Sequence, residues 1–199
     1  MPVTTKEISV IIVEDFKLTR VGLRCALNEN NDIQVVAESD NAIDGIKLIE
    51  RYHPNVVLMD LGLPGMNGIE AIEKICEKYK DIKIIALTSH DRDEEVIATL
   101  SAGATGYCLK DIDPIKLADV IRDINNGACW LDAEIGERVL RSFPKQENFK
   151  LLNDHNNNEN KIPLTEREYE VLKHLVSGKS NTEIAKELIV SVHTAKAHV

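Results

Sequence analysis

The sequence is poor in aromatic residues and has no closely spaced cysteines, no long apolar run and no excess of positive charge. Aromatic side chains make up 4% of the 199 residues, and the four cysteines lie far apart. Without a close cysteine pair, neither a zinc site nor a dense disulfide framework is indicated, and reduced thiols are the simplest interpretation. No apolar run approaches the roughly 18 residues of a membrane span, and the polar first residues lack the apolar core of a signal peptide. We therefore expect a soluble, cytoplasmic protein with no membrane contact.

The charge balance excludes one class of function. The chain has 24 Lys and Arg residues against 33 Asp and Glu residues, which gives a formal net charge of −9 at pH 7. A protein that coats nucleic acid without sequence preference needs a broadly basic surface, so that class is excluded. A small DNA-reading patch on an otherwise acidic molecule remains open. Hydrophobic residues make up 43% of the chain, enough for a real core, and the length suits one domain with a smaller partner.

Five short apolar runs alternate with amphipathic stretches in the first two thirds of the chain. The runs are apolar at consecutive positions, as is typical of parallel strands covered on both faces, and the stretches between them have helical spacing. The runs span residues 8–13, 33–37, 56–59, 82–87 and 105–109. The sequence therefore predicts an α/β domain over residues 1–127, a flavodoxin-like, doubly wound, five-stranded parallel sheet with right-handed crossovers.

The rest of the chain has a different organisation. Residues 128–162 are predicted to be a linker with one helix near 133–143, which Pro144 ends, followed by an asparagine-rich flexible stretch. From residue 163, two capping patterns of Ser or Thr followed by Glu three positions later open two short helices, and Ser191 begins a third. This pattern predicts a small all-α helix-turn-helix domain over residues 163–199.

Acidic, hydroxyl and basic side chains follow the predicted strands where each strand ends. Glu14 and Asp15 follow the first strand, Asp60 the third, Thr88 the fourth and Lys110 the fifth. Because ligands of open parallel sheets bind outside the carboxyl ends of the strands, we expect these side chains to converge. Three carboxylates in one crevice repel each other, and bound Mg²⁺ would relieve the repulsion. A nearby lysine and hydroxyl would then bind phosphoryl oxygens, with a carboxylate as the nucleophile.

The residues around these positions resemble a known family. Residues 8–126 resemble the receiver domain of two-component response regulators in Val-Glu-Asp at 13–15, Met-Asp-Leu-Gly-Leu-Pro-Gly-Met-Asn-Gly at 59–68, Leu-Thr-Ser at 87–89 and Gly-Ala-Thr-Gly-Tyr-Cys-Leu-Lys at 103–110. Residues 164–199 resemble the start of the LuxR-type helix-turn-helix in Leu-Thr-Glu-Arg-Glu, Gly-Lys-Ser-Asn-Thr-Glu-Ile-Ala and Thr-Ala-Lys-Ala-His-Val. Together the two parts resemble the NarL/FixJ class of response regulators, which regulate transcription.

The resemblance implies a phosphoacceptor and a metal site. Asp60 would accept a phosphoryl group from a sensor histidine kinase. Glu14, Asp15 and Asp60, together with the backbone carbonyl of Gly62, would hold Mg²⁺. Apart from its own phosphotransfer and dephosphorylation, such a domain is not an enzyme.

The resemblance also implies a switch. Lys110 would pair with the phosphoryl oxygens, and Thr88 would move towards them and donate a hydrogen bond while Tyr107 changes rotamer. That motion would repack the face around the fourth helix and the fifth strand, so that a local charge event shifts a two-state element.

In the second domain the resemblance implies contacts with double-stranded DNA. Ser191 would cap the recognition helix near a phosphate, Lys196 and Ala197 align with positions that approach DNA, and His198 would lie near the DNA backbone. The family continues this helix beyond the last residue here and adds a fourth that supports dimerisation. We therefore expect a C-terminally truncated form that binds DNA poorly, and a homodimer on activation of the full-length protein. The linker permits either a closed or a dissociated pair of domains.

Two other functions compete with this interpretation. An aspartate-based phosphatase also uses a nucleophilic Asp, but it needs a second acid two residues further on, where this chain has Gly62. A phosphorylation-independent regulator with the same fold, redox-tuned through Cys108, is the other alternative. Mg²⁺ binding separates it from the main hypothesis, because a vestigial pocket need not bind the ion. Cys25, Cys76 and Cys108 fall in helical or strand patterns, so we expect core thiols.

Overall fold

The structure, a computed structural model, describes residues 7–89, 92–132, 135–137, 139, 170–171, 173–174 and 181–188. The chain divides into two units, Met1–Trp130 and Leu131–Val199. The boundaries predicted at residues 127 and 162 stay predictions. Within the described stretches, no helix is long and apolar enough to cross a membrane.

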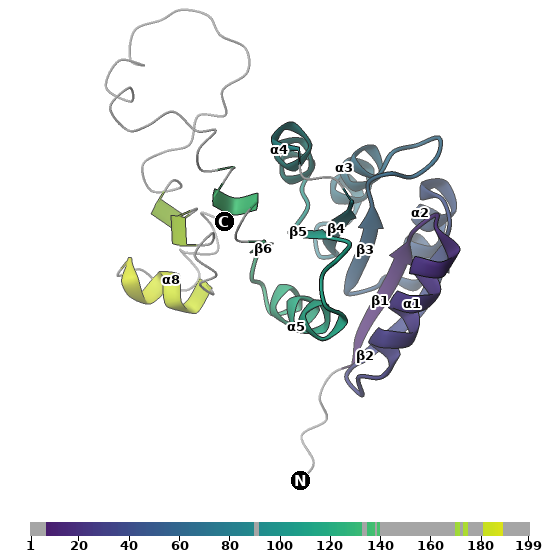
Figure 1. Cartoon of the computed structure of the whole chain (residues 1–199), viewed down its shortest axis with the longest axis horizontal. Coiled ribbons are helices and arrows are strands. Elements are labelled where there is room, and N and C mark those ends of the chain that lie inside the picture. Colours follow the sequence, from purple (N-terminus) through teal and green to yellow (C-terminus); the bar gives the residue numbers. More distant parts are fainter. Residues whose placement is uncertain are drawn as a thin grey trace, which may run out of the picture. The chain divides into compact units, whose positions relative to one another are not determined.

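The first unit is built on a sheet with the strand order β2-β1-β3-β4-β5-β6 (Figure 1). Strands β1 to β5 are parallel, and each contains most of one predicted apolar run. The predicted α/β class and the flavodoxin-like order of these five strands are confirmed. The strands are β1 Ile8–Val13, β2 Ile33–Ser39, β3 Val56–Asp60, β4 Lys83–Thr88, β5 Gly106–Leu109 and β6 Trp130–Leu131.

The sheet has one strand more than the five predicted. Strand β6 has two residues, and the Trp130 N–H donates to the Thr105 carbonyl at 3.1 Å. The Trp130 ring also packs against the hydrophobic core, and Lys116 Nζ lies 5.5 Å from the ring centroid. Two residues are too few to show an alternating pattern, which is why sequence periodicity does not detect this strand.

Helices cover both faces of the sheet. Alternate strand residues form one apolar layer with Leu27 of α1 and five residues of α5 that include Ile121, and α1 contacts α5. On the other face α3 contacts both α2 and α4. The side chains of Asn41, Asn67 and Asp113 accept backbone N–H groups at the starts of α2, α3 and α5. The helices are α1 Lys17–Asn28, α2 Ala42–Tyr52, α3 Gly68–Lys78, α4 Asp93–Ser101 and α5 Pro114–Asn125.

A polar cluster at the amino ends of the strands ties three of them together. The Asn55 side-chain oxygen accepts both the backbone N–H and the hydroxyl of Ser9 at 2.9 Å. The Asn55 carbonyl accepts the Lys83 N–H at 3.0 Å. One residue just before β3 therefore holds β1 and β4, consistent with the register in which Val56 pairs with both Val10 and Lys83.

In the second unit, described residues are helical where helices are predicted. Residues 135–137 and 139 are helical, as are 170–171 and 173–174, and α8 spans Asn181–Glu187. Val171 and Ile184 are buried, and His174 Nδ1 lies 3.1 Å from Glu187 Oε2. The predicted third helix, with Ser191, Lys196, Ala197 and His198, lies outside the described residues.

Gly68 begins α3 where no side chain fits. A Cβ at this position would collide with the backbone of Asp60 and Leu61, and the Gly68 N–H donates to the Leu61 carbonyl at 3.1 Å. The chain that leaves β3 at Asp60 is therefore pressed directly against the start of α3.

We expect Gly68→Ala to lower the free energy of unfolding by about 1–3 kcal/mol, because backbone atoms must move to admit the methyl group. Gly22→Ala is the matched control. Gly22 is exposed within α1, and an added Cβ meets nothing within 4 Å, so helix propensity alone should raise stability by about 1 kcal/mol. Urea denaturation measures both changes, and a stabilising effect of Gly68→Ala would contradict the steric argument.

Candidate functional site

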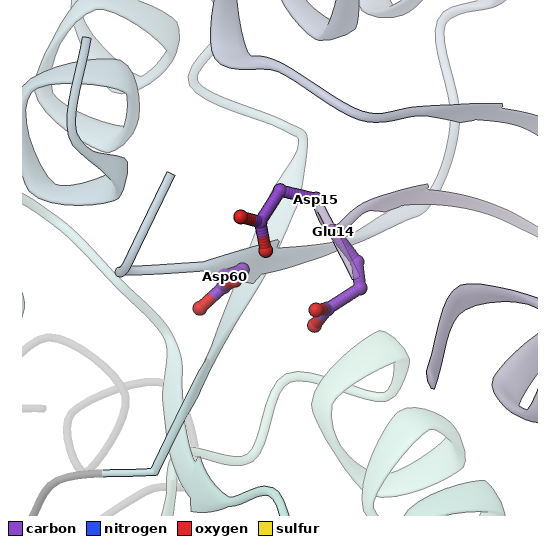
Figure 2. A group of neighbouring side chains, drawn as sticks. All are labelled: Glu14, Asp15 and Asp60. Carbon is purple, nitrogen blue, oxygen red and sulfur yellow. The ribbon is translucent and has the colours of Figure 1, made fainter. Parts of the chain in front are cut away.

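Neighbouring strands bring the predicted acidic residues to one edge of the sheet. Glu14 follows β1 and Asp60 ends β3, and these two strands are adjacent. One carboxylate oxygen from each of Glu14, Asp15 and Asp60 lies within 4.8 Å of the other two. Figure 2 shows the Asp15 carboxylate pointing towards that of Asp60. The three side chains form an acidic cluster in which Glu14 is 1% and Asp60 3% exposed, whereas Asp15 is exposed.

Lys110 balances part of this negative charge. It follows β5, and its Nζ lies 2.8 Å from both Glu14 Oε2 and Asp60 Oδ2. The ammonium also donates a hydrogen bond to Glu14 Oε1 at 3.1 Å. The backbone N–H of Lys110 donates to the Thr88 carbonyl at 2.8 Å, which fixes the lysine beside the end of β4. One ammonium therefore contacts two of the three carboxylates.

The charges at the site are not fully compensated. Burial raises the pKa of Glu14 and so does the negative Asp60, although Lys110 and the Phe16 N–H act in the opposite direction. For Lys110, burial lowers the pKa, but hydrogen bonds to Asp60 and Glu14 outweigh this effect and hold it above its usual value. Lys110 is thus firmly cationic, whereas ionised Glu14 is destabilised even with the lysine present.

The donor atoms of the acidic cluster suit a hard divalent cation. Such ions take oxygen ligands, and Mg²⁺ usually binds one or two carboxylates together with water and phosphate oxygens. Glu14 Oε2 is buried and accepts no hydrogen bond of good geometry from the part of the chain that the structure describes, although Lys110 Nζ lies nearby. No group in the described stretches hydrogen-bonds the Asp15 carboxylate. Gly62 lies beside the cluster, and its N–H donates to Asp60 Oδ1 at 2.9 Å. A ligand role for its carbonyl stays a prediction.

Thr88 lies on β4, the strand next to β3, and Tyr107 lies on β5, the strand beyond β4. Thr88 ends β4 and is 2% exposed, and its hydroxyl donates to Glu95 Oε1 in α4 at 3.1 Å. The Glu95 carbonyl in turn accepts the Thr99 hydroxyl at 2.6 Å. Tyr107 in β5 is fully buried. Sequence reasoning missed Glu95, and the only available signal was its place among three acidic residues in the first turn of α4.

The cysteines depart in part from the expectation of core thiols. Cys108 in β5 is buried and Cys76 is half-buried, but the prediction is wrong for Cys25, which is exposed. Only Leu27 is fully buried in α1, so helical spacing did not define the buried face sharply enough. Burial raises the pKa of Cys129 to about 11, so this thiol is protonated at neutral pH and a weak nucleophile.

Comparison with known proteins gives two family matches along the chain. The family described as "Response regulator receiver domain" matches residues 10–122. The family described as "Bacterial regulatory proteins, luxR family" matches residues 162–199. The transcriptional regulatory protein LiaR of Bacillus subtilis (strain 168) is 35% identical over 195 residues, which cover 96% of this chain and 87% of LiaR.

Solved structures give the same result. A two-component response regulator of the LuxR family from Aurantimonas sp. SI85-9A1 is 30% identical with a TM-score of 0.65, over 68% of this chain and 96% of that one. A structure of two RcsB dimers bound to two parallel DNAs is 25% identical with a TM-score of 0.62, over 96% of this chain and 88% of that one.

We expect Glu14→Gln to raise the free energy of unfolding at neutral pH in the presence of a chelator. The pKa of Glu14 in the folded state is raised above its ordinary value of 4.5. Ionisation therefore costs stability as the pH rises from that value through the raised pKa. Below pH 4.5 the carboxyl is protonated in both states, and the difference should disappear.

Glu50→Gln is the control of opposite sign. Glu50 lies 2.5 Å from Lys78 Nζ, and the hydrogen bond from Lys78 lowers the pKa of Glu50. Its removal should lower stability slightly at neutral pH. Urea denaturation at pH 7.5 and pH 4 measures both variants. A Glu14→Gln protein that is less stable than wild type at pH 7.5 would contradict the proposed charge imbalance.

Proposed function

The chain belongs to the two-component response regulators that carry a receiver domain and a LuxR-type DNA-binding domain, and we propose that Asp60 is its phosphoacceptor. The main support for this proposal is the position of the Asp60 carboxylate. It ends β3, is 3% exposed, and lies 2.8 Å from Lys110 Nζ and beside two further carboxylates. An Asp60 oxygen would attack the phosphorus of a phosphohistidine on a sensor histidine kinase, and the imidazole would leave.

The acidic cluster would bind Mg²⁺ during this transfer. Glu14, Asp15 and Asp60, with the Gly62 carbonyl, are the groups that would hold the ion. The ion supplies positive charge to the phosphoryl oxygens. Lys110 already contacts the Asp60 carboxylate, so the same ammonium is placed to pair with the transferred group. The uncompensated charge of Glu14 supports a cation at this position.

The proposed switch begins at Thr88. Its hydroxyl is bonded to Glu95, and it would leave this acceptor for a phosphoryl oxygen on Asp60. Because Glu95 belongs to α4, loss of the bond would release the start of that helix, and Tyr107 would change rotamer in the adjacent β5. The face formed by α4 and β5 would then differ between the two states, which is the repacking that a phosphorylation switch requires.

The output of the switch would be transcriptional regulation. In the second domain Ser191, Lys196, Ala197 and His198 would contact double-stranded DNA, and the full-length protein would bind as a homodimer in the cytoplasm. The structure of RcsB dimers on DNA supports this mode of binding for a similar chain.

Asp60→Asn tests the phosphoacceptor. With Mg²⁺ and a small phosphodonor, intact-mass measurement should show a single phosphoryl adduct on wild type, none on Asp60→Asn, and none on wild type after chelation. Asp40→Asn is the matched control, because Asp40 is an exposed acid just beyond β2 at the same edge of the sheet, and its adduct should match wild type. No adduct on folded wild-type protein would favour a phosphorylation-independent regulator.

Glu95→Ala tests the switch. A hydrogen bond of this kind contributes about 1 kcal/mol, so its removal should speed Asp60 phosphorylation by a small phosphodonor about fivefold. Glu94→Ala is the control, since Glu94 is exposed in the same first turn of α4 and should leave the rate unchanged. In a Thr88→Ala background, Glu95→Ala should have no effect. An equal gain from both glutamate variants would point to the helix terminus and against the Thr88 contact.

A further inference from the structure

We propose that Arg20 is a positioning residue for the cation site. Its side chain contacts the backbone of the loop that carries Glu14 and Asp15 and so holds that loop in place. The inference rests on the proposed function, since it concerns how the acidic cluster is kept ready to bind Mg²⁺. Arg20 lies in the second turn of α1 and belongs to none of the motifs on which the resemblance rests.

The contacts of Arg20 are to main-chain atoms of the two acidic residues. Its Nη1 donates to the Glu14 carbonyl at 2.6 Å and to the Asp15 carbonyl at 3.3 Å. The Arg20 backbone N–H donates to the Phe16 carbonyl at 3.0 Å. One side chain of α1 is thus joined to both peptide groups that set the direction of the two carboxylates.

The position of the Asp15 carboxylate depends on the backbone more than the positions of the Glu14 and Asp60 carboxylates do. The side chain of Glu14 is fixed by Lys110 and by the Phe16 N–H, and that of Asp60 by Lys110 and the Gly62 N–H. The Asp15 carboxylate is exposed and has no such partner within the described stretches, yet it points towards Asp60 (Figure 2). The peptide group held by Arg20 is therefore what sets its position.

The positive charge of the guanidinium also helps to keep the three carboxylates of the acidic cluster together. The Arg20 side chain is only 13% exposed, and a cation so placed behind the loop lessens the repulsion among the three carboxylates without occupying the space between them. Its Nε is buried without a hydrogen-bond acceptor among the described residues and lies 3.9 Å from Glu38 Oε1. A buried N–H left unpaired costs free energy. The guanidinium therefore keeps its contacts with the loop carbonyls at the cost of leaving its Nε–H unpaired.

Arg24 provides a matched comparison. It lies one turn further along α1 and its Nη1 donates to the same Glu38 Oε1, at 3.3 Å. It makes no contact with the loop carbonyls. Removing Arg24 therefore takes away the same charge and a contact with the same glutamate, and leaves the β1–α1 loop untouched.

Calorimetric titration of the whole chain with Mg²⁺ tests the proposal. Groups that orient metal ligands typically change metal affinity by about 10–100-fold when removed, and we expect a loss in this range for Arg20→Gln. Arg24→Gln should bind Mg²⁺ as wild type does. Arg20→Lys keeps the charge but not the planar guanidinium, so it should fall between Arg20→Gln and wild type. It also decides the matter should Arg20→Gln fail to fold.

A second readout separates positioning from general destabilisation. The Mg²⁺ concentration that gives half-maximal phosphorylation by a small phosphodonor should rise in Arg20→Gln in proportion to the dissociation constant. A purely structural loss would reduce the amount of active protein and leave this concentration where it is.

The outcomes distinguish the inference from the function on which it rests. Wild-type affinity in folded Arg20→Gln or Arg20→Lys would overturn the role of Arg20 alone. Equal losses in Arg20→Gln and Arg24→Gln would overturn it as well, since a shared charge effect would then explain both. Folded wild-type protein that binds no Mg²⁺ would overturn the proposed metal site, and this inference with it.

Discussion

The repulsion among three carboxylates is the constraint on which the rest of this structure depends. Glu14, Asp15 and Asp60 place carboxylate oxygens within 4.8 Å of each other. Glu14 and Asp60 are almost out of contact with water, and among the residues that the structure describes only Lys110 forms ion pairs with these carboxylates. At such distances and with reduced solvent screening, charges interact strongly. The fold tolerates this concentration of charge because the strands β1, β3 and β5 and their core hold the backbone in place. The site is therefore poised to take up positive charge.

This imbalance also explains why metal and phosphoryl group should act together in the proposed reaction. A phosphoryl group adds further negative charge to a pocket that already has an excess, so its arrival is unfavourable unless a cation accompanies it. A phosphoryl group on Asp60 would also offer the Thr88 hydroxyl oxygen acceptors that the Asp60 carboxylate alone does not place near it. A hydroxyl held by Glu95 in the resting structure then has two competing acceptors, and the charge on Asp60 decides between them. Electrostatics at the end of β3 is in this way linked to the position of α4.

The sequence was informative where short-range patterns determine the structure. Runs of consecutive apolar residues located the five parallel strands, and polar residues at the ends of these runs located Glu14, Asp60 and Lys110, because parallel strands place their carboxyl ends at one edge. Contacts made by single side chains across the fold leave no such pattern. The bond from Thr88 to Glu95 and the contacts of Arg20 with loop carbonyls depend on rotamers and helix placement, which residue type and spacing do not encode. Helical spacing likewise placed Cys25 on the wrong face of α1.

The cluster around Asn55 extends the argument to the opposite end of the sheet. Side chains along a strand alternate between its two faces, so displacement of β3 by one residue would exchange the faces and turn Asp60 into an apolar layer. Asn55 opposes such a slip by bonding β1 and β4 at once. An error in strand pairing there would abolish the chemistry at Asp60 while every residue of the site remained unaltered. The geometry of the acidic cluster therefore depends on the strand register that Asn55 holds at the opposite end of the same strands.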